Sequence, residues 1–255
     1  MLRGLPDAEV RGSRRPGSGV AAAILPRAGH ARTSTKSGRN DTLAPCVQRF
    51  PEMDDKTFMP LAQGWARVAR ARESSDDELF DALMYLGEMA VKIAVLGVVS
   101  CIGDDRERSR HRVLSTLARA DSLGKWPDAL EEALSGPGAS CLRQAAYPLQ
   151  RDLMARVSGG AWQSEGVRFL RAAASCFGPA DQVPVKVDGR RWVRSFVQLR
   201  NRTRGHGAPP QSAISAACEP LEAAVRRFTE GFALFSECEW AHLRRNCPEN
   251  TTSRA

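Results

Sequence analysis

The sequence lacks the short motifs that mark many catalytic and nucleotide-binding sites. It has no Walker loop, no G-x-G-x-x-G after a strand, no H-E-x-x-H and no G-x-S-x-G. Each of these motifs places a phosphate, a metal ion or a nucleophile in a fixed geometry. Any catalytic site in this chain must therefore be assembled from other residues.

Paired cysteines are also missing. The seven cysteines are widely separated and no two form a C-x-x-C pair, which argues against a disulfide scaffold and a zinc site. Most are expected to be small buried residues in a reducing cytoplasm. No metal and no cofactor is predicted. Acids at helix starts are expected to be cap and first-turn residues, namely Asp76, Asp77, Glu78, Asp104 and Asp105.

Aromatic residues are few, at 6%, and positive charge is unevenly placed. Nine Lys or Arg and only three acids lie in residues 1–50, so six of the eight net positive charges belong to that segment. The rest of the chain is nearly neutral, and its charge alone does not indicate nucleic-acid binding. Residues 1–55 are rich in Gly, Pro and Ser and are expected to be a disordered leader. A targeting peptide and a mis-assigned start codon are both open for this segment, whereas a secretory signal is not expected.

Residues 56–246 are expected to form one helical domain, followed by a polar tail at 247–255. Helical periodicity recurs through the domain, and the strand-like stretch 183–187 contains Pro184 and is expected to be a loop. The predicted fold is all-α, a bundle of about six to eight helices. The clearest predicted helices are 79–102, 127–134, 142–157, 161–177, 190–204 and 219–245.

The helix predicted at 79–102 is apolar around most of its surface, which predicts burial on most sides. A capping box formed by Ser75 and Glu78 should begin it. Glu88 and Lys92 interrupt the apolar run, so a membrane span is not expected. Their i,i+4 spacing also predicts an ion pair between them.

The segment FVQLRNRTRGHGAPP, residues 196–210, ends a predicted helix in a cluster of polar side chains. Apolar residues at 192, 193, 196 and 197 form one stripe, and Arg200 follows Phe196 by one helical turn. A cation beside a buried stripe needs an acidic partner or a pocket that an anion can enter. Gly205 and Gly207 should end the helix, which places His206 at its exit.

Arginine and histidine together can cleave RNA without a metal ion. An imidazole can remove the 2′-hydroxyl proton near neutral pH, and a guanidinium can stabilise the charge on the phosphorane that forms. Arg200 and His206 are the candidates for these roles, with Asn201 beside them. A similar pair, Arg106 and His111, lies in the charge run RERSRHR, which is typical of a solvated helix face.

These residues resemble the HEPN superfamily, whose helical bundles carry an R-N-x-x-x-x-H signature late in the chain. Arg200, Asn201 and His206 match its Arg, the following polar residue and its His. Residues 78–240 also resemble an uncharacterised HEPN-like region at the front of larger bacterial proteins. The shared stretches are LGEMAVKI, HRVLSTLARADSLGKWPDALEEALSGP and FVQLRNRTRGHGAP.

The resemblance implies a metal-independent ribonuclease, often with its active site across a homodimer, in toxin–antitoxin, abortive-infection or CRISPR-linked defence. Arg200 would stabilise the phosphorane, His206 would act as acid or base, and Asn201 would orient one of them or the phosphate. Arg202 and Arg204 are outside the motif and are assigned only phosphate contacts. The implied partners are RNA or a nucleotide, a second copy of the chain, and an antitoxin or a fused effector domain. No membrane partner is expected.

Three interpretations stay open for the sequence. The first is a ribonuclease that uses Arg200 and His206. The second is a non-catalytic HEPN-like module that binds a nucleotide, RNA or a partner protein. The third is a structural helical domain in which Arg200 pairs with a buried acid, since cations at a helix C-terminus are also stabilised by the helix dipole.

Overall fold

The computed structural model describes residues 22–26, 58–103, 108–204 and 209–242, and over these ranges the fold is all-α apart from one short strand pair. Eight of its helices have eight residues or more, which confirms the predicted fold class and helix number. They are α1 (Met59–Arg72), α2 (Asp76–Ser100), α3 (Ser109–Ala118), α4 (Lys125–Ser135), α5 (Tyr147–Met154), α6 (Trp162–Ser175), α7 (Gly189–Arg204) and α8 (Gln211–Gly231).

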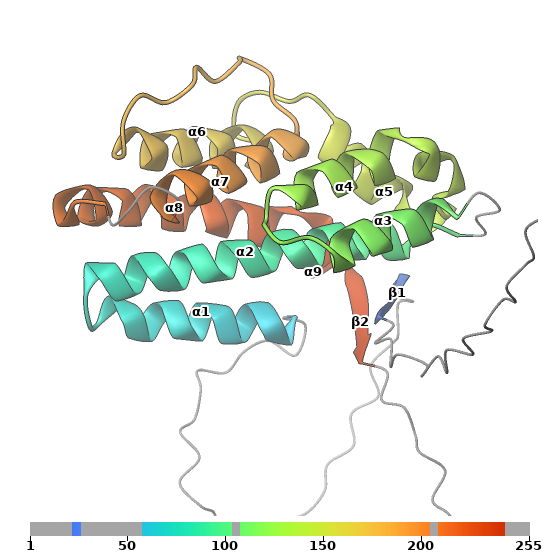
Figure 1. The fold of residues 1–255 in the computed structure, drawn as a ribbon, viewed down its shortest axis with the longest axis horizontal. Helices are drawn as coiled ribbons and strands as arrows, with labels where there is room; N and C mark the ends of the chain where they lie inside the picture. Colours follow the sequence, from blue (N-terminus) through green and yellow to red (C-terminus); the bar gives the residue numbers. More distant parts are fainter. Residues whose placement is uncertain (1–21, 27–57, 104–107, 205–208, 243–255) are drawn as a thin grey trace, which may run out of the picture.

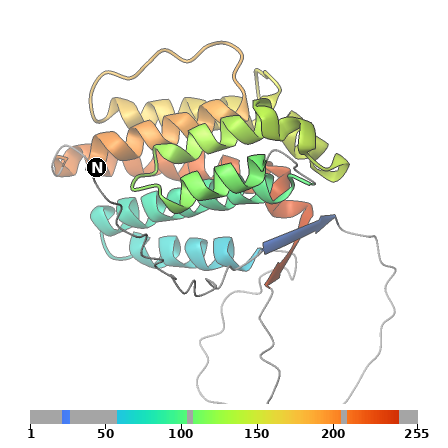
Figure 2. The same ribbon diagram turned by 45° about the vertical axis from the view of Figure 1, so that its right-hand side comes forward.

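Several shorter elements complete the described chain. Two 3-10 turns, Pro137–Cys141 and Gln144–Ala146, precede α5, and α9 (Ala233–Ser236) follows α8. Strand β1 (Ala22–Pro26) pairs antiparallel with β2 (Cys238–His242), with Ala22 opposite His242. Most of the predicted leader and the whole of the predicted tail lie outside the described residues. Figure 2 shows the strand pair beside one end of the bundle.

Two predicted helices have different boundaries in the structure. The helix predicted at 142–157 is divided into a 3-10 turn and the shorter helix α5. Pro148 is tolerated only in the first turn of a helix, so α5 begins next to it. The helix predicted at 219–245 begins earlier and ends earlier, since α8 spans Gln211–Gly231 and residues 238–242 form β2. Pro220 lies inside α8, and burial of Ile214 and Ala217 on the core face offsets its missing N–H donor.

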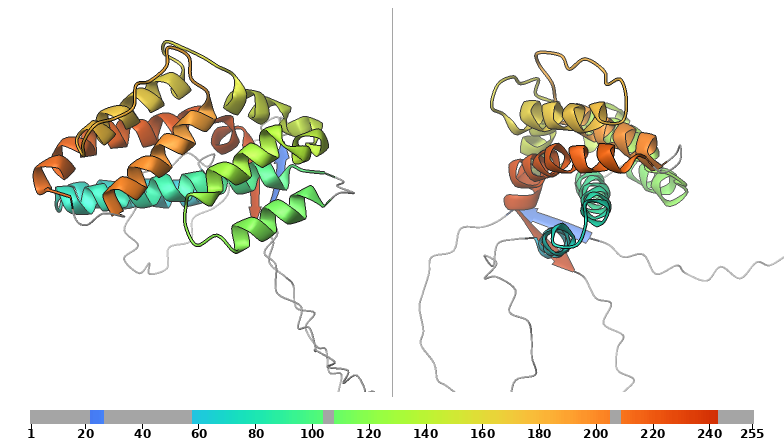
Figure 3. Two further views of the ribbon diagram at one scale, coloured as in Figure 1. Left: turned by 45° about the horizontal axis from the view of Figure 1, so that its top comes forward. Right: turned by 90° about the vertical axis from the view of Figure 1, so that its left-hand side faces the viewer.

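The helices form successive layers around α2. Figure 1 and the end-on view in Figure 3 show α1, α2, α8 and α6 stacked in that order. Helix α7 packs against α6 and also contacts α2. Helix α4 packs against α2 on one side and against α3 on another. The residues 183–187 form no strand and lie in the connection between α6 and α7, as predicted, with one isolated bridge between Val157 and Val187.

Helix α2 is the central helix of the core. The Ser75 hydroxyl accepts a hydrogen bond from the Glu78 amide at 3.2 Å, which confirms Ser75 as the N-cap. The reciprocal bond of the predicted capping box is not formed, because the Ser75 amide donates to the Ala71 carbonyl instead. By length and composition α2 resembles a membrane span, but 67% of its most apolar window is buried inside the bundle. That environment is typical of a core helix.

Aromatic rings fill the space between α7, α8 and their neighbours. Trp192 stacks on Phe196 with a centroid distance of 5.4 Å and on Phe228 of α8 with 4.0 Å. Glycines on the facing helices make this approach possible. A Cβ at Gly166 of α6 would lie 2.7 Å from Trp192 Cδ1, and a Cβ at Gly87 of α2 would overlap the ring of Phe196.

We therefore expect Gly87→Ala to lower the free energy of unfolding by about 1–2 kcal/mol. Alanine favours a helix over glycine by about 1 kcal/mol, but a Cβ that overlaps a ring held by stacking places the overpacking cost in the upper part of its usual range, at about 2–3 kcal/mol. Urea unfolding measures the difference. Gly160→Ala is the control, because nothing lies within 4 Å of its Cβ position, and equal stability of the two variants would contradict the packing argument.

Candidate functional site

The last turn of α7 carries four of the five candidate residues. Its N-terminal end is fixed by Asp188, whose carboxylate accepts a hydrogen bond from the Arg191 amide at 2.9 Å. Its middle is fixed by the buried stripe that contains Trp192 and Phe196. The described part of α7 ends at Arg204, and His206 lies outside the described residues. The structure describes the surroundings of the three arginines and the asparagine.

Arg200 forms an ion pair with Glu88 of α2. The Arg200 Nε donates to Glu88 Oε1 at 2.9 Å, and the two side chains are 29% and 14% exposed. Glu88 lies next to Gly87, where α7 comes close to α2, and Arg200 lies one helical turn after Phe196, which packs on Gly87. The same close approach that seats the aromatic ring thus brings the guanidinium to the carboxylate.

Glu88 also contacts a second cation of α7. Arg204 Nη1 lies 3.5 Å from Glu88 Oε1, and Arg204 Nη2 lies 3.2 Å from Asp81 Oδ1 near the start of α2. Asp81 is 69% exposed, so its pair with Arg204 contributes little in water. The two arginines and the two acids are electrically balanced. An incoming phosphate would therefore meet a cluster without net charge.

Neither of the other two candidates forms a hydrogen bond or ion pair with Glu88 within the described residues. Arg202 Nη1 donates to the carbonyl oxygens of Pro179 at 2.9 Å and of Ala174 at 3.5 Å, so it ties the α6–α7 connection to α7. Asn201 is exposed and its Oδ1 lies 3.5 Å from Arg200 Nη1, a long contact. The structure thus brings Arg200, Asn201 and Arg204 together and assigns Arg202 to a different face of the helix.

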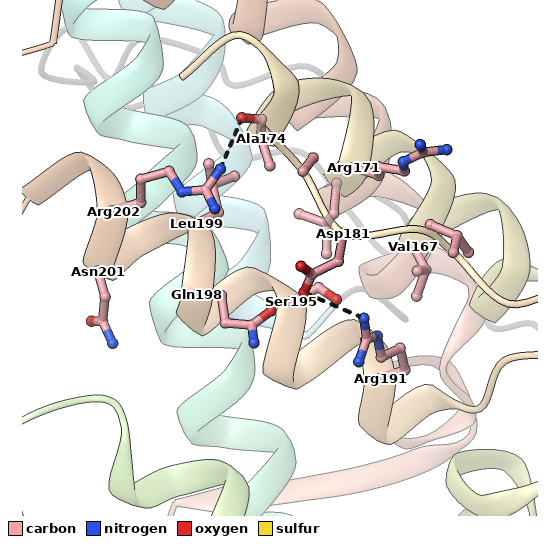
Figure 4. Close-up of a pocket in the computed structure, with 13 residues that line it drawn as sticks. Val167, Arg171, Ala174, Asp181, Arg191, Ser195, Gln198, Leu199, Asn201 and Arg202 are labelled. Carbon is pink, nitrogen blue, oxygen red and sulfur yellow. Dashed lines mark hydrogen bonds and ion pairs between the residues drawn. The ribbon is translucent and has the colours of Figure 1, made fainter. Parts of the chain in front are cut away.

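A cavity of about 410 Å³ lies between α6, the connection 176–188 and α7; we call it the α6–α7 pocket. Asn201, Arg202, Arg191 and Asp181 are among its lining residues. Figure 4 shows Arg202 directed toward Ala174 and Arg191 directed toward Asp181. Arg200 is not among its lining residues. Asn201 therefore stands between the motif arginine and this pocket.

Glu88 is the residue of this site that sequence reasoning missed. The predicted ion pair with Lys92 is not formed within the described residues. Lys92 Nζ instead lies 5.9 Å from the ring centroid of Trp126, and Glu88 pairs across 112 positions with Arg200. A signal was present, because an acid inside an apolar, buried helix requires a cationic partner. The identity of that partner depends on helix packing and could not be read from spacing.

The remaining sequence candidates do not join this site. His111 lies exposed on α3, and its neighbour Arg106 is outside the described residues. His242 belongs to β2 instead of a helix. Asp76, Asp77 and Glu78 occupy the first turn of α2, as expected for acids at the positive end of a helix. Over the described ranges, no group of three or more His, Cys, Asp or Glu is placed to hold a metal ion.

Comparisons with known proteins give no further guide. No protein-family model matches the chain, and neither a curated protein nor a solved structure matches it. The functional assignment therefore rests on the side chains at the end of α7 and on the motif they form.

We expect Glu88→Gln to lower the free energy of unfolding by about 1–2 kcal/mol, because Gln can still accept from Arg200 Nε but no longer neutralises its partly buried charge. Urea unfolding at neutral pH measures the change. Asp81→Asn removes a carboxylate from the same cluster but at an exposed position, so its effect should stay within about 0.5 kcal/mol. A similar loss in both variants would show that burial of the pair is not what matters.

Proposed function

We propose that this protein is a HEPN-like helical domain that cleaves RNA at the end of α7 without a metal ion. The observation that carries the proposal is the position of Arg200. Its Nε is held by Glu88, while Nη1 is directed toward exposed Asn201 at 3.5 Å. A guanidinium fixed on one side keeps terminal donors for a phosphate on the other, and fixed donors stabilise a transition state without reorganisation.

The proposed reaction needs only groups that this motif contains. An imidazole removes the proton from a ribose 2′-hydroxyl, and the resulting oxygen attacks the adjacent phosphorus. The bond from phosphorus to the 5′-oxygen breaks, and a protonated imidazole gives its proton to that oxygen. The products are a 2′,3′-cyclic phosphate and a free 5′-hydroxyl. Arg200 stabilises the phosphorane between these steps, and Asn201 orients the phosphate.

One imidazole cannot be both base and acid in the same concerted step. Two copies of the chain would bring two His206 side chains, which is consistent with the homodimer that the resemblance implies. Arg204 is the first candidate to bind a neighbouring phosphate, because its exposed contact with Asp81 is weak enough to be replaced. Arg202 is less available, since its Nη1 is used by two backbone carbonyls.

The Arg200–Glu88 pair also supports a second candidate function. A carboxylate that neutralises the motif arginine reduces its attraction for phosphate, which favours a non-catalytic module that binds a nucleotide, RNA or a partner protein. It is likewise the arrangement expected if Arg200 serves only the stability of the fold. RNA cleavage would indicate the ribonuclease, and binding without cleavage would indicate the non-catalytic module. Absence of both would indicate a structural domain.

The wider context is proposed from the resemblance and, for the cytoplasmic location, from the unpaired cysteines. It places the protein in the bacterial cytoplasm, in a defence or toxin–antitoxin system, with an antitoxin or a fused effector domain as partner. Within the described residues, no contact or cavity identifies such a partner.

We expect the purified full chain to cut single-stranded RNA in the presence of EDTA and to leave cyclic phosphate ends. His206→Ala should lower the rate about 10²–10⁴-fold, because the proton-transferring group is lost. The assay is gel analysis of end-labelled RNA, with the ends identified by phosphatase sensitivity. His111→Ala is the matched control, since it removes an exposed histidine from a similar Arg–His spacing and should leave the rate unchanged.

Two results would decide against the ribonuclease. Equal activity of His206→Ala and the unaltered chain would remove His206 from the reaction. Saturable RNA binding without cleavage, weakened by Arg200→Ala, would favour the non-catalytic module instead.

A further inference from the structure

The α6–α7 pocket has the size of a small-molecule site. Its volume of about 410 Å³ lies within the range of about 300–1,000 Å³ that is usual for ligand pockets. Its floor is formed by side chains that are almost fully buried, among them Val167, Leu170 and Leu199. Polar side chains of α7, including Ser195 and Gln198, line it beside this floor. An apolar floor with a few polar groups is the composition expected of a binding site.

The charge of the pocket selects an anion. Three arginines line it, Arg171, Arg191 and Arg202, against one acid, Asp181. The pairing between them is weak, since Arg191 Nη2 lies 3.8 Å from an Asp181 carboxylate that is 73% exposed. Figure 4 shows this pair meeting over Ser195. The pocket therefore keeps about two uncompensated positive charges.

Arg191 has an unused donor at this pocket. Its Nε is buried, and none of the described residues accepts a hydrogen bond from it. A buried donor without a partner costs about 1–3 kcal/mol, which the side chain recovers when it turns toward an acceptor. Arginine also binds carboxylate and phosphate groups through two parallel hydrogen bonds. These properties make Arg191 the central contact for an anionic group.

The shape of the pocket is maintained from its far end. Arg202 donates to the carbonyl oxygens of Pro179 and Ala174, so the connection that forms one wall is tied to α7. A pocket with a fixed wall needs little reordering to bind, which favours affinity. Among the described residues that line it there is no aromatic side chain to stack on a nucleobase.

We propose that the α6–α7 pocket binds a small organic polyanion that carries two or more phosphate or carboxylate groups on a non-aromatic body. Arg191 and Arg171 hold its charged groups, and the floor of Val167, Leu170 and Leu199 contacts its carbon skeleton. The site is separate from Glu88 and Arg200, and it does not depend on RNA cleavage. Asn201 lines the pocket and also contacts Arg200, so a bound anion would lie next to the motif.

Isothermal titration calorimetry of the full chain at fixed ionic strength tests the proposal, because screening by added salt is then constant. The probes are fructose 1,6-bisphosphate for phosphates, citrate for carboxylates and AMP for an aromatic monophosphate. We expect saturable binding of at least one of the first two, stronger than that of AMP. Absence of saturable binding by both polyanions, or tighter binding of AMP, would overturn the proposal.

Matched variants locate the binding site. Arg191→Gln should weaken binding of the polyanion tenfold or more. Arg194→Gln removes the same charge from the same helix on the face that pairs with Glu131 at 2.8 Å, and it should change binding less than twofold. Arg171→Gln, an exposed change that spares the fold, should also weaken binding. Equal affinity of all three variants and the unaltered chain would assign the anion to another surface.

Discussion

The close approach of α7 to α2 is the constraint on which the rest of this structure depends. It is possible because Gly87 has no side chain at the place where the ring of Phe196 packs, and the stack of Trp192 on Phe228 holds α7 from the other side. Close-packed interiors tolerate few changes of volume, so this contact fixes the rotation of α7 as well as its distance. The direction of every polar side chain in its last turn follows from that rotation.

One consequence is that the two faces of α7 have different electrostatics. On the face toward α2, Arg200 and Arg204 meet Glu88 and Asp81, and the charges balance. On the face toward α6, three arginines meet one exposed acid, and the pocket stays cationic. A phosphate at the motif meets the partly buried carboxylate of Glu88, whereas an anion in the pocket competes only with the exposed carboxylate of Asp181. The two proposals of anion recognition therefore differ in what each must displace.

Glu88 has an ambiguous role that follows from this balance. It fixes Arg200 through Nε, which preorganises the remaining donors, and it also cancels the charge that would attract a substrate. In an enzyme, an acid of this kind orients the cation so that it stabilises the transition state. It is useful when this stabilisation exceeds the attraction for the substrate that the acid cancels. A structural domain would use the same acid only to neutralise a partly buried guanidinium. An enzyme and a structural domain would share this ion-pair geometry, and only a measurement of RNA cleavage distinguishes them.

The sequence by itself determined the fold class, a core helix predicted at 79–102 with Ser75 as its cap, and the apolar stripe that orients α7, because these depend on local periodicity and capping. It also placed Arg200 next to Asn201 at the end of that helix. It misjudged the ends of α8, where burial offsets the missing donor of Pro220. Only the tertiary structure decided that Glu88 pairs with Arg200 and that residues of α6, α7 and their connection enclose a pocket. Such contacts join positions far apart in the chain, and their geometry is set by the packing of one helix on another.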